Sequence, residues 1–124
     1  MTQISEAESR IMDALWDAAP LSAEEIFYRV GPANDWAAGT VKTLITRLLR
    51  KNAIAGGREG DAYRYRPLVA RAAYVHAESK SLLDRLFKGE VAPLVAHFSE
   101  QKALTDKDIR KLKALIAKIE EDRK

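Results

Sequence analysis

The chain has no cysteine among its 124 residues, and this absence excludes several classes of protein. Without thiols there is no disulfide framework, no thiolate metal site and no cysteine nucleophile, so stability has to come from packing. Long apolar runs are missing too. No stretch approaches the roughly 20 residues that span a bilayer, and the first residues lack the basic and apolar layout of a signal peptide. We therefore expect the protein to stay in the cytoplasm.

Histidine is also scarce, since His76 and His97 are the only two and lie on different predicted helices. With no cysteine to complete a site, we expect ordinary packing or surface roles for them, no metal and no cofactor. No nucleophile-and-base arrangement is visible, and Gly56-Gly57 precedes no phosphate-loop lysine. An enzyme is therefore not expected, although a deep pocket lined by paired ionisable groups would point back to one.

The charge is small in total but unevenly distributed. The net charge is +3, with 47% hydrophobic and 31% charged residues, which is typical of one globular domain or two very small ones. Residues 1–36 contain two basic and seven acidic side chains, whereas residues 37–66 contain seven basic and two acidic ones. Positive charge concentrated in one segment is typical of phosphate binding. The alternative is a solvated basic surface.

Two capping boxes mark the beginnings of the first two helices. In this motif a serine and a glutamate three residues later each accept a hydrogen bond from the other's backbone. The pairs are Ser5 with Glu8 and Ser22 with Glu25. They predict helices over residues 6–16 and 23–30, the first stopped before Pro20 and the second by Gly31-Pro32.

The third predicted helix has the clearest two-faced pattern. Its apolar residues recur at helical spacing and predict a core face; they are Val41, Leu44, Ile45, Leu48 and Leu49. The other face carries only hydroxyl and basic side chains, namely Thr40, Lys42, Thr43, Thr46, Arg47 and Arg50. Solvated helix faces usually mix both signs of charge, so this acid-free face is expected to lie against phosphates and base edges.

A β-hairpin is predicted after Asn52. Residues 53–55 read as a strand, the glycine-rich segment 56–61 as a turn, and residues 62–67 as a strand that alternates apolar and basic side chains. Arg58, Arg64 and Arg66 should project from its tip and exposed side, and we assign Arg58 and Arg64 to phosphate contacts. Tyr63 and Tyr65 are expected to pack under the third helix, with base contact as the alternative.

The second half of the chain is expected to be helical, over residues 71–87, 91–98 and 105–121, with Thr105 and Asp108 at the start of the last helix. Three short helices cannot close a core alone, so we expect a homodimer. The alternative is that they fold back on the same chain. The side chains assigned to the dimer interface are Tyr74, Leu82, Leu86, Leu94, Phe98, Ile109, Leu112, Ile116 and Ile119, the last four forming a coiled-coil-like seam.

Three helices followed by a hairpin are the order of a winged helix-turn-helix, whose third helix enters the major groove of DNA. The expected fold is thus mainly α with a small β-hairpin: a DNA-binding domain over residues 1–69, then a three-helix dimerisation domain over residues 70–124. Lys42 and Arg47 suit guanine acceptors, and threonine methyl groups suit thymine. A winged-helix protein-interaction module without sequence-specific DNA binding is the alternative.

Short motifs along nearly the whole chain carry a family resemblance. They are Ser5-Glu6-Ala7-Glu8 with Ile11-Met12 and Leu15-Trp16, Asp35-Trp36, Thr40-Val41, Thr43-Leu44, Arg47-Leu48 with Lys51, Glu59-Gly60, Tyr65, Pro67-Leu68, and Leu94-Val95-Ala96 with Phe98. In order and spacing, the chain resembles the penicillinase-repressor family, the BlaI/MecI type of bacterial regulator. The resemblance implies a dimeric repressor that binds inverted repeats in promoters of genes for antibiotic resistance, cell-wall stress or metal handling.

The chain departs from that family's pattern at three places. Ala37-Ala38-Gly39 stands where members commonly have Ser-Pro-Lys, so the usual N-cap and one cation are missing and the base preference is expected to differ. Antibiotic-responsive members are cut at an Asn-Phe bond by a membrane-bound sensor metalloprotease; the matching pair here is His97-Phe98, which makes cleavage there a hypothesis. The copper-responsive branch uses C-terminal cysteines, which this chain lacks, so thiolate metal sensing is excluded.

Overall fold

The computed structural model of this protein describes residues 3–124. The chain divides into two units, Met1–Val75 and His76–Lys124. This division comes later than the predicted boundary after residue 69, because the beginning of the fourth helix packs with the first unit. Among the described residues, no helix is both long enough and apolar enough to cross a membrane.

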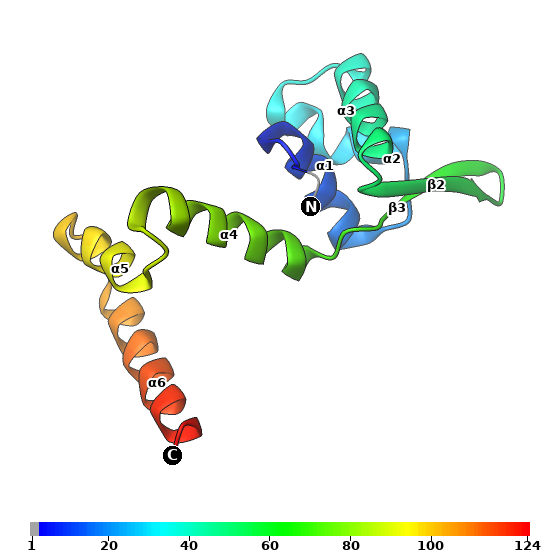
Figure 1. The fold of residues 1–124 in the computed structure, drawn as a ribbon. Helices are drawn as coiled ribbons and strands as arrows, with labels where there is room; N and C mark the ends of the chain where they lie inside the picture. Colours follow the sequence, from blue (N-terminus) through cyan, green and yellow to red (C-terminus); the bar gives the residue numbers. More distant parts are fainter. Residues whose placement is uncertain (1–2) are drawn as a thin grey trace. The chain divides into compact units, whose positions relative to one another are not determined.

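The first unit consists of three helices and a small antiparallel sheet (Figure 1). In chain order its elements are α1 (Glu6–Ala18), β1 (Leu21–Ser22), α2 (Ala23–Val30), the 3-10 turn η1 (Pro32–Asn34), α3 (Ala38–Arg50), β2 (Ile54–Glu59) and β3 (Ala62–Pro67). The predicted order of three helices followed by a hairpin is confirmed. In Figure 1, β2 and β3 extend as a ribbon away from these helices.

Both predicted capping boxes are present, and they fix where α1 and α2 begin. The Ser5 hydroxyl accepts a hydrogen bond from the Glu8 amide at 3.1 Å, and the Ser5 amide donates to the Glu8 carboxylate at 2.8 Å. Ser22 and Glu25 make the same reciprocal pair at 3.1 and 3.0 Å. Each box satisfies backbone donors that a helix start otherwise leaves without partners.

The core of the first unit lies where α1, α2 and α3 meet. Its fully buried side chains include Ile11, Met12, Leu15, Ile26, Val41, Leu48 and Ile54. From α3, the predicted apolar residues Val41, Leu44, Ile45 and Leu48 are buried, and Leu49 packs on them half-buried. The apolar face of α3 is therefore buried in the core, and its opposite face is exposed to solvent.

The sheet contains one strand more than the predicted hairpin. Its order is β1-β3-β2, and β1 pairs with β3 through Leu21 opposite Tyr65 and Ser22 opposite Arg64. A two-residue strand is too short to show an alternating pattern in sequence. The predicted turn over residues 56–61 was wrong as well, because β2 runs through to Glu59. The turn is Gly60-Asp61, where Gly60 has a positive φ of 66°.

Gly56 belongs to β2, where it pairs with Tyr65, and two tyrosine rings leave no room there for a side chain. A Cβ atom at Gly56 would stand 2.5 Å from Cε1 of Tyr63 and 3.0 Å from Cε1 of Tyr65. Tyr65 is half-buried against the core, as predicted, and its ring meets Tyr63 edge-on at 5.4 Å. The prediction of core packing was wrong for Tyr63, which is 51% exposed because it lies farther along the ribbon.

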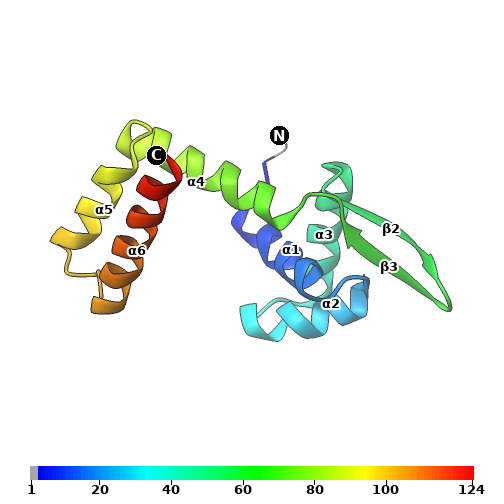
Figure 2. The same cartoon turned by 90° about the horizontal axis from the view of Figure 1, so that it is seen from below.

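The second unit contains the rest of α4 (Arg71–Phe87), α5 (Val91–Glu100) and α6 (Asp106–Asp122). Thr105 and Asp108 form a complete capping box at the start of α6, with hydrogen bonds of 3.0 and 3.1 Å. Figure 2 shows α5 and α6 side by side, joined by a short connection. The three predicted helices are confirmed, and α5 extends slightly farther, to Glu100.

Tyr74 requires a correction, since the sequence assigned it to the dimer interface. Its ring lies 5.4 Å from that of Trp16, and it packs half-buried against the core of the first unit. The indole of Trp16 also donates a hydrogen bond to the carbonyl of Val69 at 2.8 Å. The segment that follows the hairpin is thereby attached to α1, which accounts for the later boundary.

A buried ion pair joins α1 to the end of α3. Glu8 is only 1% exposed, and its Oε1 accepts a hydrogen bond from Nζ of Lys51, which follows α3 directly. The same Nζ donates to the carbonyl of Gln3 at 2.9 Å. Burial raises the pKa of Glu8, but hydrogen bonds from Lys51 and Ser5 outweigh it and hold that pKa below its ordinary value. Glu8 therefore stays charged inside the protein.

We predict that Lys51→Met lowers the free energy of unfolding by about 1–3 kcal/mol at pH 7, because it leaves the Glu8 carboxylate buried without its cation. A depressed folded pKa gives stability that is present above the unfolded pKa of about 4.3 and lost as the pH falls through the folded value. The difference in the free energy of unfolding between the unaltered protein and Lys51→Met, measured by urea unfolding, should therefore be smaller at about pH 3.5 than at pH 7.

The matched control is Glu8→Gln, which removes the charge but keeps an oxygen for the Ser5 amide. Glu8→Gln/Lys51→Met should be more stable at pH 7 than Lys51→Met alone, because a buried amide costs less than a buried unpaired carboxylate. A deficit for Lys51→Met that is the same at both pH values would contradict the ion-pair interpretation.

Candidate nucleic-acid interface

The exposed face of α3 carries every residue that the sequence assigned to a recognition helix. Thr40, Lys42, Thr43, Thr46, Arg47 and Arg50 are all exposed. Among the described residues 3–124, none of the three cations in this set has an acidic partner within ion-pair distance. The face is thus positively charged and not neutralised from within its own unit.

Two threonines on this face make hydrogen bonds within their own helix. The hydroxyl of Thr43 donates to the carbonyl of Gly39, and that of Thr46 donates to the carbonyl of Lys42, each at 3.0 Å. Because a hydroxyl has one hydrogen, each oxygen is left able only to accept a further bond. Toward DNA these side chains can accept from an amino group of adenine or cytosine, or contact a thymine methyl group.

The beginning of α3 has no side-chain cap, as the sequence predicted. Ala37 occupies the N-cap position in an extended conformation, with φ −79° and ψ 163°, and makes no capping hydrogen bond. A Cβ atom on Gly39 would meet nothing within 4 Å. Helix starts present unpaired backbone amides and the positive end of the helix dipole, so this one can face an anion. In contrast, Ser22 and Glu25 close the beginning of α2.

The three arginines of the hairpin differ in what they contact. Arg58 on β2 is exposed and, within residues 3–124, has no acidic partner. Arg66 pairs with Glu59 across the hairpin at 2.5 Å. Arg64 does not project freely as predicted: it is half-buried, and its guanidinium pairs with the carboxylate of Glu25 on α2.

Glu25 is the functional residue whose second role the sequence did not reveal. Hydrogen bonds from the amide and hydroxyl of Ser22, together with the charge of Arg64, hold the pKa of Glu25 below its ordinary value. Its capping role was visible from the three-residue spacing. Its pairing with Arg64 was not, because that contact depends on the register of β1 against β3, which no local pattern indicates.

A hollow of about 500 Å³ lies between α2, the start of α3 and the hairpin. It is lined by Ser22, Ala23, Glu24, Phe27, Ala38, Lys42, Ala62 and Tyr63. Lys42 therefore stands where the recognition helix and the hairpin border the same concave surface. The hollow also borders Glu24 of α2, so one cation and one acid stand at its edge.

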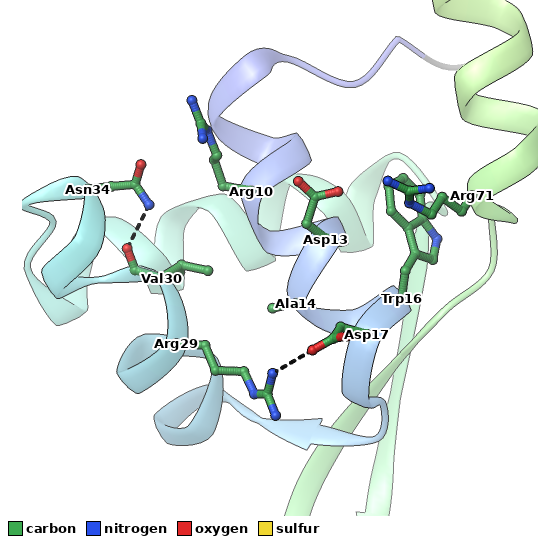
Figure 3. Close-up of a pocket in the computed structure, with 9 residues that line it drawn as sticks. All are labelled: Arg10, Asp13, Ala14, Trp16, Asp17, Arg29, Val30, Asn34 and Arg71. Carbon is green, nitrogen blue, oxygen red and sulfur yellow. Dashed lines mark hydrogen bonds and ion pairs between the residues drawn. The ribbon is translucent and has the colours of Figure 1, made fainter. Parts of the chain in front are cut away.

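A second hollow of the first unit, of about 550 Å³, is lined by residues of α1, α2, η1 and Arg71 (Figure 3). Arg29 and Asp17 form an ion pair across it at 3.0 Å, and the amide of Asn34 donates to the carbonyl of Val30 at 2.8 Å. Arg10 and Asp13 also border it, so both signs of charge are present. This surface lacks the acid-free character of α3, and no sequence pattern indicated it.

The predicted dimer residues of the second unit fall into two groups, one lining a hollow and one exposed to solvent. Leu94, Phe98 and Leu112 line a hollow of about 570 Å³ between α5 and α6. Leu82, Leu86, Ile109, Ile116 and Ile119 are large hydrophobic side chains exposed to solvent. No residue of α4, α5 or α6 is buried. The second unit thus presents apolar side chains without a core to bury them.

The histidines do not come together with other possible metal ligands. The ring of His97 lies next to those of Phe87 and Phe98, with centroid separations of 6.3 and 5.3 Å. In the part of the chain that the structure describes, no group of three or more histidine and acidic side chains is placed to hold a metal ion.

Comparison with known proteins agrees with this arrangement. The family model described as penicillinase repressor matches residues 4–118. The penicillinase repressor of Bacillus licheniformis is 28% identical over 110 residues, which cover 89% of this chain and 86% of that protein. The methicillin resistance regulatory protein MecI of Staphylococcus aureus (strain N315) is 30% identical over 116 residues, which cover 94% of each chain. These names describe repressors and regulators, not enzymes.

A similar solved structure is that of BlaI from Bacillus licheniformis, in its monomeric form in complex with the blaP half-operator. It is 27% identical to this chain, with a TM-score of 0.54, and the match covers 59% of this chain and 89% of that one. The family model matches most of this chain, and both curated relatives match along nearly their whole length. The chain belongs to the penicillinase-repressor family.

Proposed function

We propose that this protein is a transcriptional repressor that binds double-stranded operator DNA in the cytoplasm, with α3 in the major groove. The observation that carries the proposal is the face of α3. It exposes three threonines and three cations that have no acidic partner within residues 3–124, and it contains no acidic residue. The likeness to BlaI, whose solved complex contains a half-operator, supports it.

We assign the contacts by the chemistry that each side chain offers. Lys42 and Arg47 are placed to donate to guanine acceptors in the major groove. Thr43 and Thr46 accept from base amino groups or contact thymine methyl groups, because their hydroxyl hydrogens are used within α3. Thr40 and Arg50 at the two ends of the face and Arg58 on the hairpin contact the phosphate backbone and set the register of the protein on DNA.

We further propose that the second unit makes the protein a homodimer. Its helices contain no buried residue, and Ile116, at 53% exposure, is typical of the large apolar side chains along α6. A second copy buries the same surface on both chains about a two-fold axis. Two α3 helices related by that axis read two half-sites in opposite directions, so the operator is an inverted repeat.

Proteolysis in α5 is a further part of the proposal. The bond between His97 and Phe98 lies inside α5, and both side chains are exposed. A cut at this bond separates α6, with its apolar stripe, from the DNA-binding unit. A membrane-bound sensor metalloprotease of the kind that the family resemblance implies would therefore release the operator by removing the dimer contact, after local opening of α5.

Arg47→Ala is expected to weaken binding to the cognate duplex by about 1–3 kcal/mol while leaving random DNA nearly unaffected, if Arg47 reads a base. Arg58→Ala should weaken binding to both DNAs alike, because a phosphate contact is sequence-independent. It should also lower the salt slope, which is the steepness with which the logarithm of the binding constant falls with the logarithm of the salt concentration, by about 1. The measurement is fluorescence anisotropy at several salt concentrations, with a duplex of about 30 base pairs selected from a randomised pool, enough for two half-sites.

Arg10→Ala is the control for these variants, since it removes one positive charge from α1, outside the α3 face. Its affinity for cognate DNA and for random DNA should change only by the small amount that the loss of one net positive charge causes. If Arg47→Ala lost the same affinity for cognate DNA as for random DNA, the base-reading role of Arg47 would be contradicted. Equal binding of both DNAs by the unaltered protein would contradict the repressor proposal itself.

Ile116→Glu should dissociate the dimer, because it places a charge in an apolar contact. Operator affinity should then fall by about 10²–10⁴-fold, the gain that two linked half-sites provide, while binding to a single half-site is retained. Dimer mass is measured by analytical ultracentrifugation. The control, Ala114→Glu, adds the same charge two residues away, which is the far side of a helix. A dimer that survives Ile116→Glu would place the interface elsewhere.

In cells exposed to a cell-wall antibiotic, we expect mass spectrometry of the tagged protein to find a fragment that ends at His97. His97→Pro, which alters the other residue of the proposed bond and lies outside the residues assigned to the dimer, should prevent that fragment and keep the target gene repressed. Because proline in a helix also destabilises it, dimer mass is checked in parallel. Derepression while the chain remains intact would reject cleavage as the inducing event.

A further inference from the structure

Arg64 occupies a junction between the hairpin and the helix-turn-helix. On the central strand β3 it lies opposite Gly57 of β2 on one side and opposite Ser22 of β1 on the other. Ser22 is at the same time the N-cap residue of α2. The position of Arg64 in the sheet therefore places its side chain beside the first turn of α2.

One carboxylate oxygen joins these elements. Oε1 of Glu25 accepts a hydrogen bond from the Ser22 amide at 3.0 Å and a second one from Nη1 of Arg64. The side chains of Arg64 and Glu25 are 30% and 45% exposed, so water screens the pair only in part. A single atom, Oε1 of Glu25, thus accepts hydrogen bonds from both the N-cap residue of α2 and the hairpin.

Ile54 and Tyr65 pack against the core and hold the base of the hairpin, so the direction of its outer part depends on fewer contacts. Beyond the two residue pairs with β1, the strands β2 and β3 pair only with each other, and two-stranded ribbons are marginally stable and twist readily. The ion pair between Arg66 and Glu59 lies within the hairpin and does not connect it to a helix. In the described chain, the pair of Arg64 with Glu25 is the one ion pair between the hairpin and α2.

We propose that Arg64 and Glu25 form a tether that sets the angle of the hairpin to α2 and α3, and that Arg64 acts through Glu25 rather than on a phosphate. This inference rests on the proposed function and replaces the phosphate role first assigned to Arg64. Since Glu25 neutralises Arg64, the contacting cation of the hairpin is Arg58. Arg64 and Glu25 are positioning residues for DNA binding.

The two roles of Arg64 predict opposite effects of one substitution. Glu25→Gln keeps a side-chain oxygen for the Ser22 amide but removes the negative charge. If Arg64 contacts a phosphate, this change frees its charge, so DNA binding tightens and the salt slope steepens. If the pair is a tether, the change loosens the hairpin and DNA binding weakens. The sign of the effect therefore separates the two.

The experiment measures binding of the full chain to the selected duplex for Glu25→Gln, Arg64→Gln and the double variant. We expect each single variant to lose about 2- to 5-fold in affinity, the range of a partly exposed ion pair. The double variant should be no worse than either single one, and the salt slope should stay unchanged. Arg64→Lys should restore part of the affinity, and urea unfolding confirms that each variant is folded.

Hairpin motion gives a second measurement that needs no DNA. Because the chain has no cysteine, Asp61→Cys in the turn accepts a single fluorescent label. The nanosecond anisotropy decay of this label should show larger motion in Glu25→Gln and Arg64→Gln than in the unaltered chain. Arg66→Gln, which removes an equal charge within the hairpin, should leave the motion closer to that of the unaltered chain.

Tighter DNA binding by Glu25→Gln together with a lower salt slope for Arg64→Gln would overturn the tether and restore the phosphate contact. Unchanged label motion and unchanged affinity in both variants would overturn it as well. If the unaltered protein binds no duplex DNA, the proposed function fails, and the label motion alone then decides whether the tether exists.

Discussion

The packing of α3 is the constraint on which the rest of the molecule depends. Four of its side chains, Val41, Leu44, Ile45 and Leu48, are buried against α1 and α2. Because a helix has a fixed periodicity, burying these four determines which residues face away. The core of the first unit therefore fixes the exposed face with its three cations, and the same contacts that stabilise the fold orient the proposed DNA-reading surface.

Electrostatic pairing divides the cations near this surface into two groups. Acidic residues hold Lys51, Arg64 and Arg66 through Glu8, Glu25 and Glu59. Ion pairs of this kind connect one element to another, whereas Lys42, Arg47, Arg50 and Arg58 have no acidic partner among residues 3–124. The basic charge that the sequence concentrates in residues 37–66 thus serves both cohesion and, as we propose, contact with phosphate and bases.

Local patterns predicted the elements well and long-range contacts poorly. The starts of α1, α2 and α6 depend on residues three positions apart, and the apolar spacing of α3 covers little more than two turns, so both are visible in the sequence. Glu8 and Lys51 are 43 positions apart, and Glu25 and Arg64 are 39 apart. No periodicity indicates such pairs. The same reason explains why the position of Tyr74 was missed, whereas β1 is too short to show a pattern and the glycines of β2 are typical of a turn.

The two units bury their apolar side chains in different ways, and this difference bears on regulation. The first unit has its own core, whereas α4, α5 and α6 contain no buried residue. The stability of the second unit must then come mainly from whatever covers its apolar surfaces, and for a homodimer it depends on protein concentration. Damage to α5 or α6 would in that case cost dimerisation before it cost the fold of α3. A repressor built this way loses its operator through the loss of linked half-sites, while each DNA-binding unit stays folded.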